Sequence, residues 1–207
     1  MMVFKGISEP LAVVNQRNGQ LDVKLLKPAG YNEFLLGVTA DWFFHLKAEF
    51  EAVNKRILNF THGGCYRTYD GQLGLFLKRY VKVGWTTFAG APAANRKVWP
   101  AIDKADPHYA LNPTKTLWIK RGVLDAADRL HYPATAAVPG FSNHGLGMAI
   151  DLAIGLPSAP QSLTIPDRVW LENNIDRFGF TYESSSEPWH VTYYVADGCP
   201  TYMSESH

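Results

Sequence analysis

The chain has 207 residues, of which 46% are hydrophobic and 19% are charged, and its formal net charge is +1. This is an ordinary globular composition, without the basic excess typical of nucleic-acid binders. No apolar run is long enough to cross a membrane, and the N-terminal residues lack the pattern of a signal peptide. We therefore expect no nucleic-acid partner, no membrane partner and no export signal of its own.

The N-terminal part predicts short irregular elements followed by one long helix. Asn18-Gly19 and residues 28–30 are turn signals, and alternation over residues 21–25 predicts a short strand. Thr39 is a candidate N-cap for a helix over residues 39–59. Its expected apolar face consists of Phe43, Leu46, Phe50, Val53 and Ile57.

The middle of the chain predicts a strand with a Gly-rich bend at 58–67 and a helix that starts near Asp70. Residues 84–120 show no sustained periodicity and are typical of a functional loop or hairpin insertion, with a strand at 116–120. A short helix is expected over 121–131. We expect His62, His108 and His131 to be structural, since none has a partner pattern. Cys65 and Cys199 can form one disulfide or remain two thiols, and we expect thiols.

The C-terminal third predicts a buried strand over 148–154, a helix over 166–178 and two closing strands. Pro166 suits the first position of the helix, and Gly179 suits its C-terminal end. The closing strands are expected at 180–182 and 189–195. Helices and strands alternate irregularly, which indicates a single α+β domain with an antiparallel sheet and flanking helices.

Asp151 lies in the middle of an apolar strand and needs a partner for its charge, because burying an unpaired carboxylate is costly. His144 precedes it by seven residues. Gly145 and Gly147 lie between them and let the chain bend, so that the imidazole can approach the carboxylate. Ala149 shares a strand face with Asp151 and leaves room for an ion.

A third ligand is offered by the segment Glu-Pro-Trp-His that ends at His190. Two histidines and one carboxylate suit Zn²⁺ and leave a fourth position open for water. We therefore expect one zinc ion per chain, bound by His144, Asp151 and His190. Glu187 suits the role of general base, which takes the proton of the water. We expect Trp189 to be mainly a core residue.

These residues form the pattern Ser142-x-His144-x-x-Gly-x-Ala149-x-Asp151, followed by Glu187-x-Trp189-His190. The pattern resembles the zinc-dependent D-alanyl-D-alanine carboxypeptidase and dipeptidase family (peptidase family M15), which includes phage L-alanyl-D-glutamate endolysins. Tyr66-Arg67-Thr68-Tyr69 with Gln72 resembles the upstream element of that family, although Thr68 stands where serine is usual. Residues 138–145 look most like actinobacterial and actinobacteriophage members.

The resemblance implies a Hedgehog/D,D-peptidase-like zinc fold, with a zinc peptidase catalytic domain over 35–207 and an N-terminal extension over 1–34. It also implies that Arg67 stabilises the oxyanion that develops on the scissile carbonyl. Ser142 is interpreted as a substrate-orienting hydroxyl rather than a nucleophile, because no G-x-S-x-G elbow surrounds it. Gln72 and Tyr66 are further candidates for substrate binding, and Gln72 can equally be a helix-surface residue.

The function implied is hydrolysis of peptidoglycan stem peptides at the bacterial cell wall, as a D-Ala-D-Ala carboxypeptidase or an L-Ala-D-Glu endopeptidase. The missing signal peptide favours a phage-released or virion-associated protein, with phage virion partners or otherwise a monomer. The alternative is a non-catalytic zinc-containing binding module or a phage structural module of the same fold. The presence of both Glu187 and Arg67 favours the enzyme.

Overall fold

The computed structural model describes most of the chain outside one long internal segment and the C-terminal end. The described residues are 2, 4–14, 16–82, 136–137, 139–140, 142–156 and 158–195. Several features expected from the sequence lie outside them: the stretch 84–120 with its strand, the helix at 121–131, His108, His131 and Cys199. That Cys65 and Cys199 remain two thiols rather than form a disulfide therefore stays a prediction.

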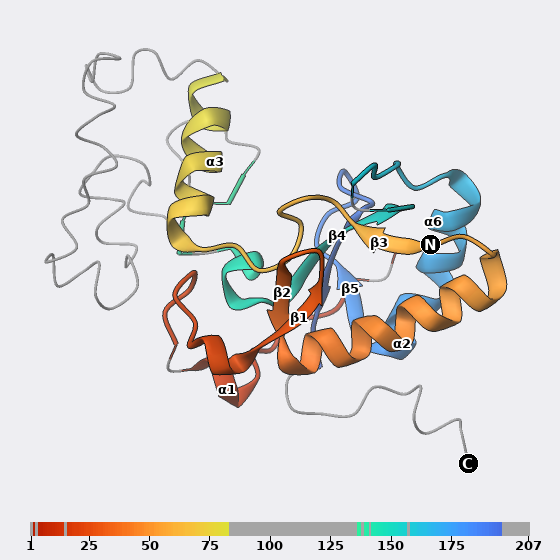
Figure 1. Ribbon diagram of the computed structural model, residues 1–207, viewed down its shortest axis with the longest axis horizontal. Coiled ribbons are helices and arrows are strands. Elements are labelled where there is room, and N and C mark those ends of the chain that lie inside the picture. Colours follow the sequence, from red (N-terminus) through yellow and green to blue (C-terminus); the bar gives the residue numbers. More distant parts are fainter. Residues whose placement is uncertain are drawn as a thin grey trace, which may run out of the picture. The chain divides into compact units, whose positions relative to one another are not determined.

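Contacts within the chain divide it into two compact units. The first unit comprises Met1–Gln16, Leu21–Arg67 and Leu146–His207, and it contains every described strand. The second unit comprises Arg17–Gln20 and Thr68–Gly145. Its described part contains the helix α3, Tyr69–Lys82, which begins one residue before Asp70 (Figure 1). The division at residues 34 and 35 that the sequence suggested stays a prediction.

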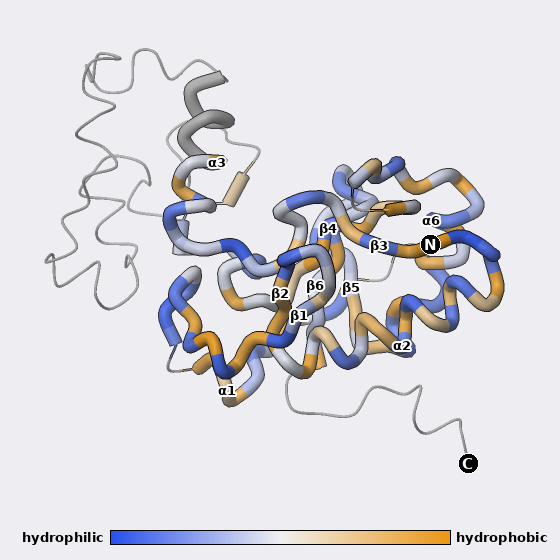
Figure 2. The backbone as a smooth tube through the Cα atoms, viewed as in Figure 1, coloured by the Kyte–Doolittle hydropathy of each residue, from blue (hydrophilic) through white to orange (hydrophobic). Residues whose placement is uncertain are grey.

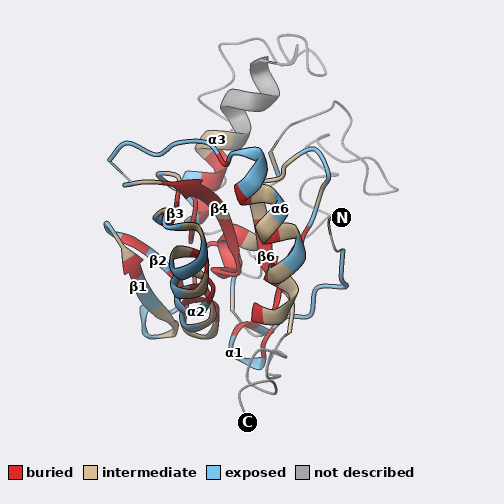
Figure 3. Ribbon diagram, turned by 90° about the vertical axis from the view of Figure 1, so that its right-hand side faces the viewer, coloured by how far each residue is buried: buried red, intermediate tan, exposed pale blue. Residues whose placement is uncertain are grey.

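Among its described residues, the first unit is built on a four-stranded antiparallel sheet with the order β3-β4-β6-β5. The strands are β3 Leu58–Phe60, β4 Ala149–Ile154, β5 Phe180–Tyr182 and β6 His190–Tyr193. Figure 3 shows that β4 is almost wholly buried, and only Asp151 among its six residues retains intermediate exposure. A separate antiparallel pair consists of β1, Leu26–Gly30, and β2, Glu33–Leu36.

The helix α2, Gly37–Asn54, covers the core with one face (Figure 2). Phe43, Leu46 and Phe50 are fully buried, as their spacing predicted. The Phe43 ring lies 5.9 Å from that of Phe60 on β3, and the Phe50 ring lies 5.3 Å from that of Trp170. The helix α2 therefore packs on both the sheet and the helix that contains Trp170.

Two details of α2 differ from the expectation. The helix begins at Gly37, so Thr39 lies inside its first turn and is fully buried rather than acting as the N-cap. It ends at Asn54, where Lys55 adopts a left-handed conformation, and this leaves Val53 54% and Ile57 45% exposed. The apolar face is therefore shorter than the sequence predicted.

The helix α6, Ile165–Asn174, continues as a 3-10 turn, η5, over Ile175–Phe178. A capping box fixes its start, since the Thr164 backbone N–H donates to the Asp167 carboxylate at 2.7 Å. Arg56 also donates to this carboxylate. Gly179 closes the segment with a φ of 78°, a conformation that favours glycine. The helix begins one residue before the predicted Pro166, so this proline is its second residue. The predicted end at Phe178 is the end of the 3-10 turn, since the α-helix itself stops at Asn174.

The N-terminal residues are less regular than the sequence suggested. The alternating run at 21–25 forms a 3-10 turn, η1, over Val23–Leu25, because the Asp22 carboxylate accepts from the Lys24 backbone N–H at 3.0 Å. A short helix, α1, spans Leu11–Val14. None of the described helices is both long and apolar enough to cross a membrane. The α+β class with antiparallel pairing, predicted from the sequence, is confirmed.

Candidate metal centre

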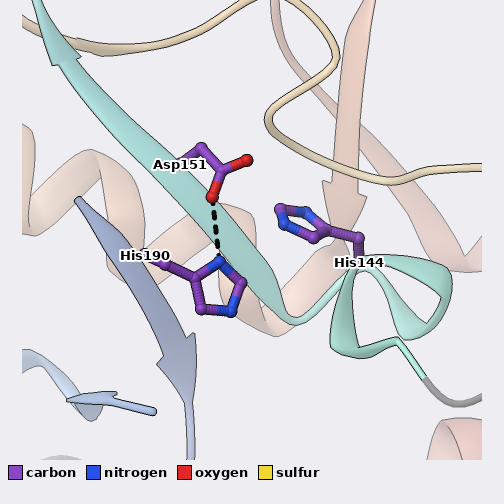
Figure 4. Close-up of side chains that lie close together, drawn as sticks. All are labelled: His144, Asp151 and His190. Carbon is purple, nitrogen blue, oxygen red and sulfur yellow. Dashed lines mark hydrogen bonds and ion pairs between the residues drawn. The ribbon is translucent and has the colours of Figure 1, made fainter. Parts of the chain in front are cut away.

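Two of the expected ligands lie directly opposite each other on neighbouring strands. The antiparallel register of β4 and β6 pairs Asp151 with His190, so both side chains project from the same face of the sheet. The His190 Nδ1 lies 2.8 Å from the Asp151 Oδ1 (Figure 4). Asp151, the carboxylate within the apolar strand, therefore has His190 as its partner, because the two strands pair in this register.

His144 comes from a 3-10 turn, η4, over Asn143–Leu146, and its side chain points toward the other two (Figure 4). It is 4% exposed. His144, Asp151 and His190 each offer one ligand atom, and these atoms all lie within 4.8 Å of one another. The three residues that the sequence predicted as a metal site are thus brought together.

Two glycines shape the turn that carries His144. Gly147 has a φ of +67°, and a Cβ there would lie 2.7 Å from the Leu36 backbone nitrogen, which donates to the Gly147 carbonyl. A Cβ at Gly145 would lie 1.9 Å from the Asn18 Oδ1. A side chain at either position would push the turn away from these atoms. Glycine is therefore needed here for two reasons: it lets the backbone bend, as the sequence suggested, and it lets the turn pack closely against Leu36 and Asn18.

The donor set fits a divalent cation of the zinc type. Two imidazole nitrogens and one carboxylate oxygen are the ligands of catalytic zinc sites, which retain an open position. The Asp151–His190 hydrogen bond already holds two of the donors side by side. We conclude that His144, Asp151 and His190 are the residues that can hold the metal.

The second nitrogen of His190 also has a partner. Its Nε2 lies 3.1 Å from the Glu183 Oε1, and the Thr192 hydroxyl donates to the same oxygen. Burial lowers the pKa of His190, but its interactions with Asp151 and Glu183 outweigh burial and raise this pKa to about 9. Glu183 is not among the site residues predicted from the sequence. The hairpin of strands 180–182 and 189–195 would have indicated it, since continued pairing places it opposite His190.

Arg67 lies beside the same carboxylate. Its Nη2 is 3.8 Å from the Asp151 Oδ2, and the same nitrogen donates to the Gly63 carbonyl at 2.9 Å. The Arg67 side chain is 17% exposed, so the guanidinium keeps some access to solvent. Glu33 in turn accepts from the Gly63 backbone N–H at 2.6 Å. These contacts hold a cation next to the candidate metal ligands.

Glu187 lies in the turn before β6. Its carbonyl accepts from the His190 backbone N–H at 2.9 Å, so the backbone of Glu187 is tied to a ligand. Within the described part of the chain its carboxylate makes no hydrogen bond or ion pair. Trp189, expected in the core, is 41% exposed, because it precedes the strand and only its backbone carbonyl pairs with β4, at Leu152.

The three expected substrate-binding residues are buried or half-buried and have contacts of their own. The Ser142 carbonyl accepts from the Asn18 side-chain amide at 2.9 Å. Gln72, 2% exposed, donates to the Ala137 carbonyl at 2.6 Å, so it is no helix-surface residue. The Tyr66 hydroxyl accepts from a backbone N–H at 3.2 Å, and burial raises the pKa of Tyr66. Their substrate contacts stay predictions. His62 is exposed, 3.6 Å from Glu33.

Two histidines and one aspartate, two of them on an antiparallel sheet and one on a 3-10 turn, form a donor set that catalytic zinc sites use. A family model described as VanY, D-alanyl-D-alanine carboxypeptidase, matches residues 38–196. The chain therefore belongs to this family of peptidases that act on peptidoglycan. No curated protein sequence gives a significant match.

The chain is also similar to solved structures of peptidases. VanYB in complex with D-alanine-D-alanine has a TM-score of 0.51 and 16% sequence identity, covering 93% of this chain and 85% of that chain. The vancomycin resistance D,D-pentapeptidase VanY, in complex with Zn(II), has a TM-score of 0.48 and 20% identity, covering 81% of this chain and 77% of that chain. At this identity the likeness to VanYB shows the fold.

Proposed function

We propose that this chain is a zinc-dependent peptidase that hydrolyses the stem peptides of peptidoglycan. The observation that carries the proposal is the cluster of His144, Asp151 and His190, whose ligand atoms lie within 4.8 Å of one another in a member of the D-alanyl-D-alanine carboxypeptidase family. The zinc in the VanY complex supports the choice of metal.

The residues around the cluster have the groups that amide hydrolysis needs. Zinc bound here would polarise the scissile carbonyl and make hydroxide available near neutral pH. Glu187 takes the proton of the attacking water and delivers it to the leaving amine. Arg67 directs its guanidinium at the oxygen on which negative charge develops. Ser142, Gln72 and Tyr66 orient the peptide.

The bond we favour is the D-Ala-D-Ala bond at the end of the stem peptide. The family model and the D-alanine-D-alanine bound to VanYB support this choice. The other candidate is the L-Ala-D-Glu bond, for which the endolysin resemblance is the reason. Digestion of defined pentapeptide muropeptides, followed by mass spectrometry, separates the two: loss of one alanine supports the carboxypeptidase, and release of a longer peptide supports the endopeptidase.

A non-catalytic zinc module of the same fold is the alternative to the enzyme. The presence of Arg67 beside Asp151, at 3.8 Å, favours catalysis, because a purely structural zinc site does not need that cation. The test is hydrolysis by the zinc-loaded protein, before and after removal of the metal with a chelator. Zinc binding without any hydrolysis of stem peptides would support the binding module.

The substrate places the protein at the bacterial cell wall. Release by a phage or carriage in a virion is a finer proposal, and it rests on the resemblance of residues 138–145 to actinobacteriophage proteins. A monomer is expected unless virion partners are present. Size-exclusion chromatography with light scattering tests the monomer, and mass spectrometry of purified virions tests carriage.

A further inference from the structure

We propose that Glu183 is a positioning residue for the metal ligand His190, an inference that rests on the proposed metal site. Glu183 fixes the imidazole in the tautomer and orientation that direct Nδ1 toward Asp151 and His144. It lies outside the motif by which the family was recognised, and it follows the last residue of β5.

The strand register places Glu183 in line with the ligands. β5 pairs with β6 through Tyr182 and Val191, and one further step along this antiparallel register brings Glu183 beside His190. β6 pairs with β4 through His190 and Asp151. Residues directly opposite one another share a sheet face, so the imidazole lies between two carboxylates in a row across three neighbouring strands.

The contacts of the imidazole assign different roles to the two carboxylates. Nδ1 faces the Asp151 Oδ1 at 2.8 Å, on the side of the metal cluster. Nε2 faces the Glu183 Oε1 at 3.1 Å, on the other side of the ring. The two nitrogens of an imidazole point in different directions. Glu183 therefore contacts the metal ligand His190 but is not itself one of the three residues that can bind the metal.

A neutral imidazole carries one proton, and the metal needs the lone pair of the nitrogen that faces it. If Nδ1 is the ligand atom, the proton resides on Nε2 and needs an acceptor. The Glu183 carboxylate provides this acceptor and increases the electron density that the ring offers to a metal. Carboxylates in this outer position typically contribute about 10- to 100-fold to metal affinity.

Thr192 holds Glu183 in place. Its hydroxyl donates to the same Oε1 that contacts His190, and Thr192 is fully buried in β6. Thr192 lies two residues beyond His190 and therefore on the same face of the sheet. The Glu183 side chain itself is 30% exposed, so the buried hydroxyl helps to hold a carboxylate that is partly accessible to solvent.

The zinc dissociation constant, measured by competition with a chromophoric chelator, tests the inference. We expect Glu183→Ala to bind zinc about 10- to 100-fold more weakly than the natural protein, and Glu183→Gln to show a smaller loss because the amide oxygen still accepts a hydrogen bond. The matched control is Glu49→Gln on α2, expected to bind zinc as tightly as the natural protein. Dissociation constants for Glu183→Ala within twofold of the natural protein would overturn the inference.

A second measurement reports the tautomer directly. In the zinc-loaded protein, ¹⁵N NMR of the histidine side chains is expected to show the proton of His190 on Nε2, and this signal is expected to exchange faster with water in Thr192→Val. This variant keeps the shape of the side chain and replaces the hydroxyl with a methyl group, so it serves even if Glu183→Ala fails to fold. A proton on Nδ1 of His190 would overturn the assignment.

The two proposals fail differently. If the natural protein does not bind zinc, the proposed function fails, and the positioning role fails with it. If the natural protein binds zinc and hydrolyses stem peptides while the Glu183 variants retain full affinity, only the positioning role is wrong.

Discussion

Asp151 and His190 belong to paired strands, whereas His144, Arg67 and Glu187 belong to turns and loops. The strand pair owes its geometry to backbone register, which places the two side chains opposite each other before any side-chain contact is made. The loop residues owe theirs to particular close contacts, such as that of Gly147 with Leu36. The difference indicates that the sheet fixes two of the three metal ligands, and that the third ligand depends on a turn that single substitutions can displace.

The largest loss of zinc and activity is expected when His190, the metal ligand on β6, is replaced. We expect His190→Ala to lose stoichiometric zinc and all hydrolysis above background, because it removes one ligand and also the hydrogen-bond partner of Asp151. Elemental analysis after dialysis, together with muropeptide digestion, measures both. His45→Ala, at an exposed position of α2, is the control and is expected to behave as the natural protein. Full zinc content in His190→Ala would contradict the ligand assignment.

The next largest effect is expected at Glu187, where a substitution should reduce turnover without reducing metal binding. Glu187→Ala is expected to retain zinc but to lose about 10²- to 10⁴-fold in turnover, the range of a general base. Its carboxylate makes no contact that positions a ligand within the described residues, so zinc affinity is expected to stay close to that of the natural protein. Turnover comparable to that of the natural protein would show that another group moves the proton.

A smaller effect measures how far the turn that carries His144 depends on its glycine. Gly147→Ala is expected to lower the free energy of unfolding by more than the roughly 1–3 kcal/mol of left-handed backbone strain alone, since its Cβ would lie 2.7 Å from the Leu36 nitrogen. Gly63→Ala is the matched control, with a φ of +70° and nothing within 4 Å. Urea denaturation of the metal-free proteins compares them, and equal losses would refute the packing argument.

The smallest effect concerns the reactivity of Cys65, which lies in the loop that carries Arg67. Burial, followed by the nearby carboxylates of Glu33 and Asp151, raises the pKa of the Cys65 thiol, so little reactive thiolate is present at pH 8. In Cys199→Ser, we expect Cys65 to react with a disulfide reagent at least about tenfold more slowly in the native protein than in urea. Equal rates would show that this loop opens readily.

Residues whose environment follows from local periodicity were predictable from the sequence. The buried face around Phe43 and the strand around Asp151 follow from spacing alone. His144 could be expected near Asp151 because glycines separate them. The contacts that direct the turn could not be expected, since they involve Leu36 and Asn18, far away in the sequence.

The sequence did not predict the environment of residues that depends on where a helix or strand begins, or on how two strands pair. Trp189 was assigned to the core as part of an apolar strand, but β6 begins one residue later. Thr39 has the side chain of an N-cap, yet α2 starts two residues before it. Glu183 carries no motif, and its contact with His190 depends on the register of β5 and β6 across the serine-rich turn.

The antiparallel pairing of Asp151 with His190 also restricts how this gene can change length. Removing or adding one residue within β4 or β6 would turn a ligand to the opposite side of the sheet, which abolishes the cluster in a single event. The turn over 184–186, in which Ser185 and Ser186 are exposed, is under no such constraint. Insertions and deletions among homologues are therefore expected to accumulate in that turn and to be absent from the two strands.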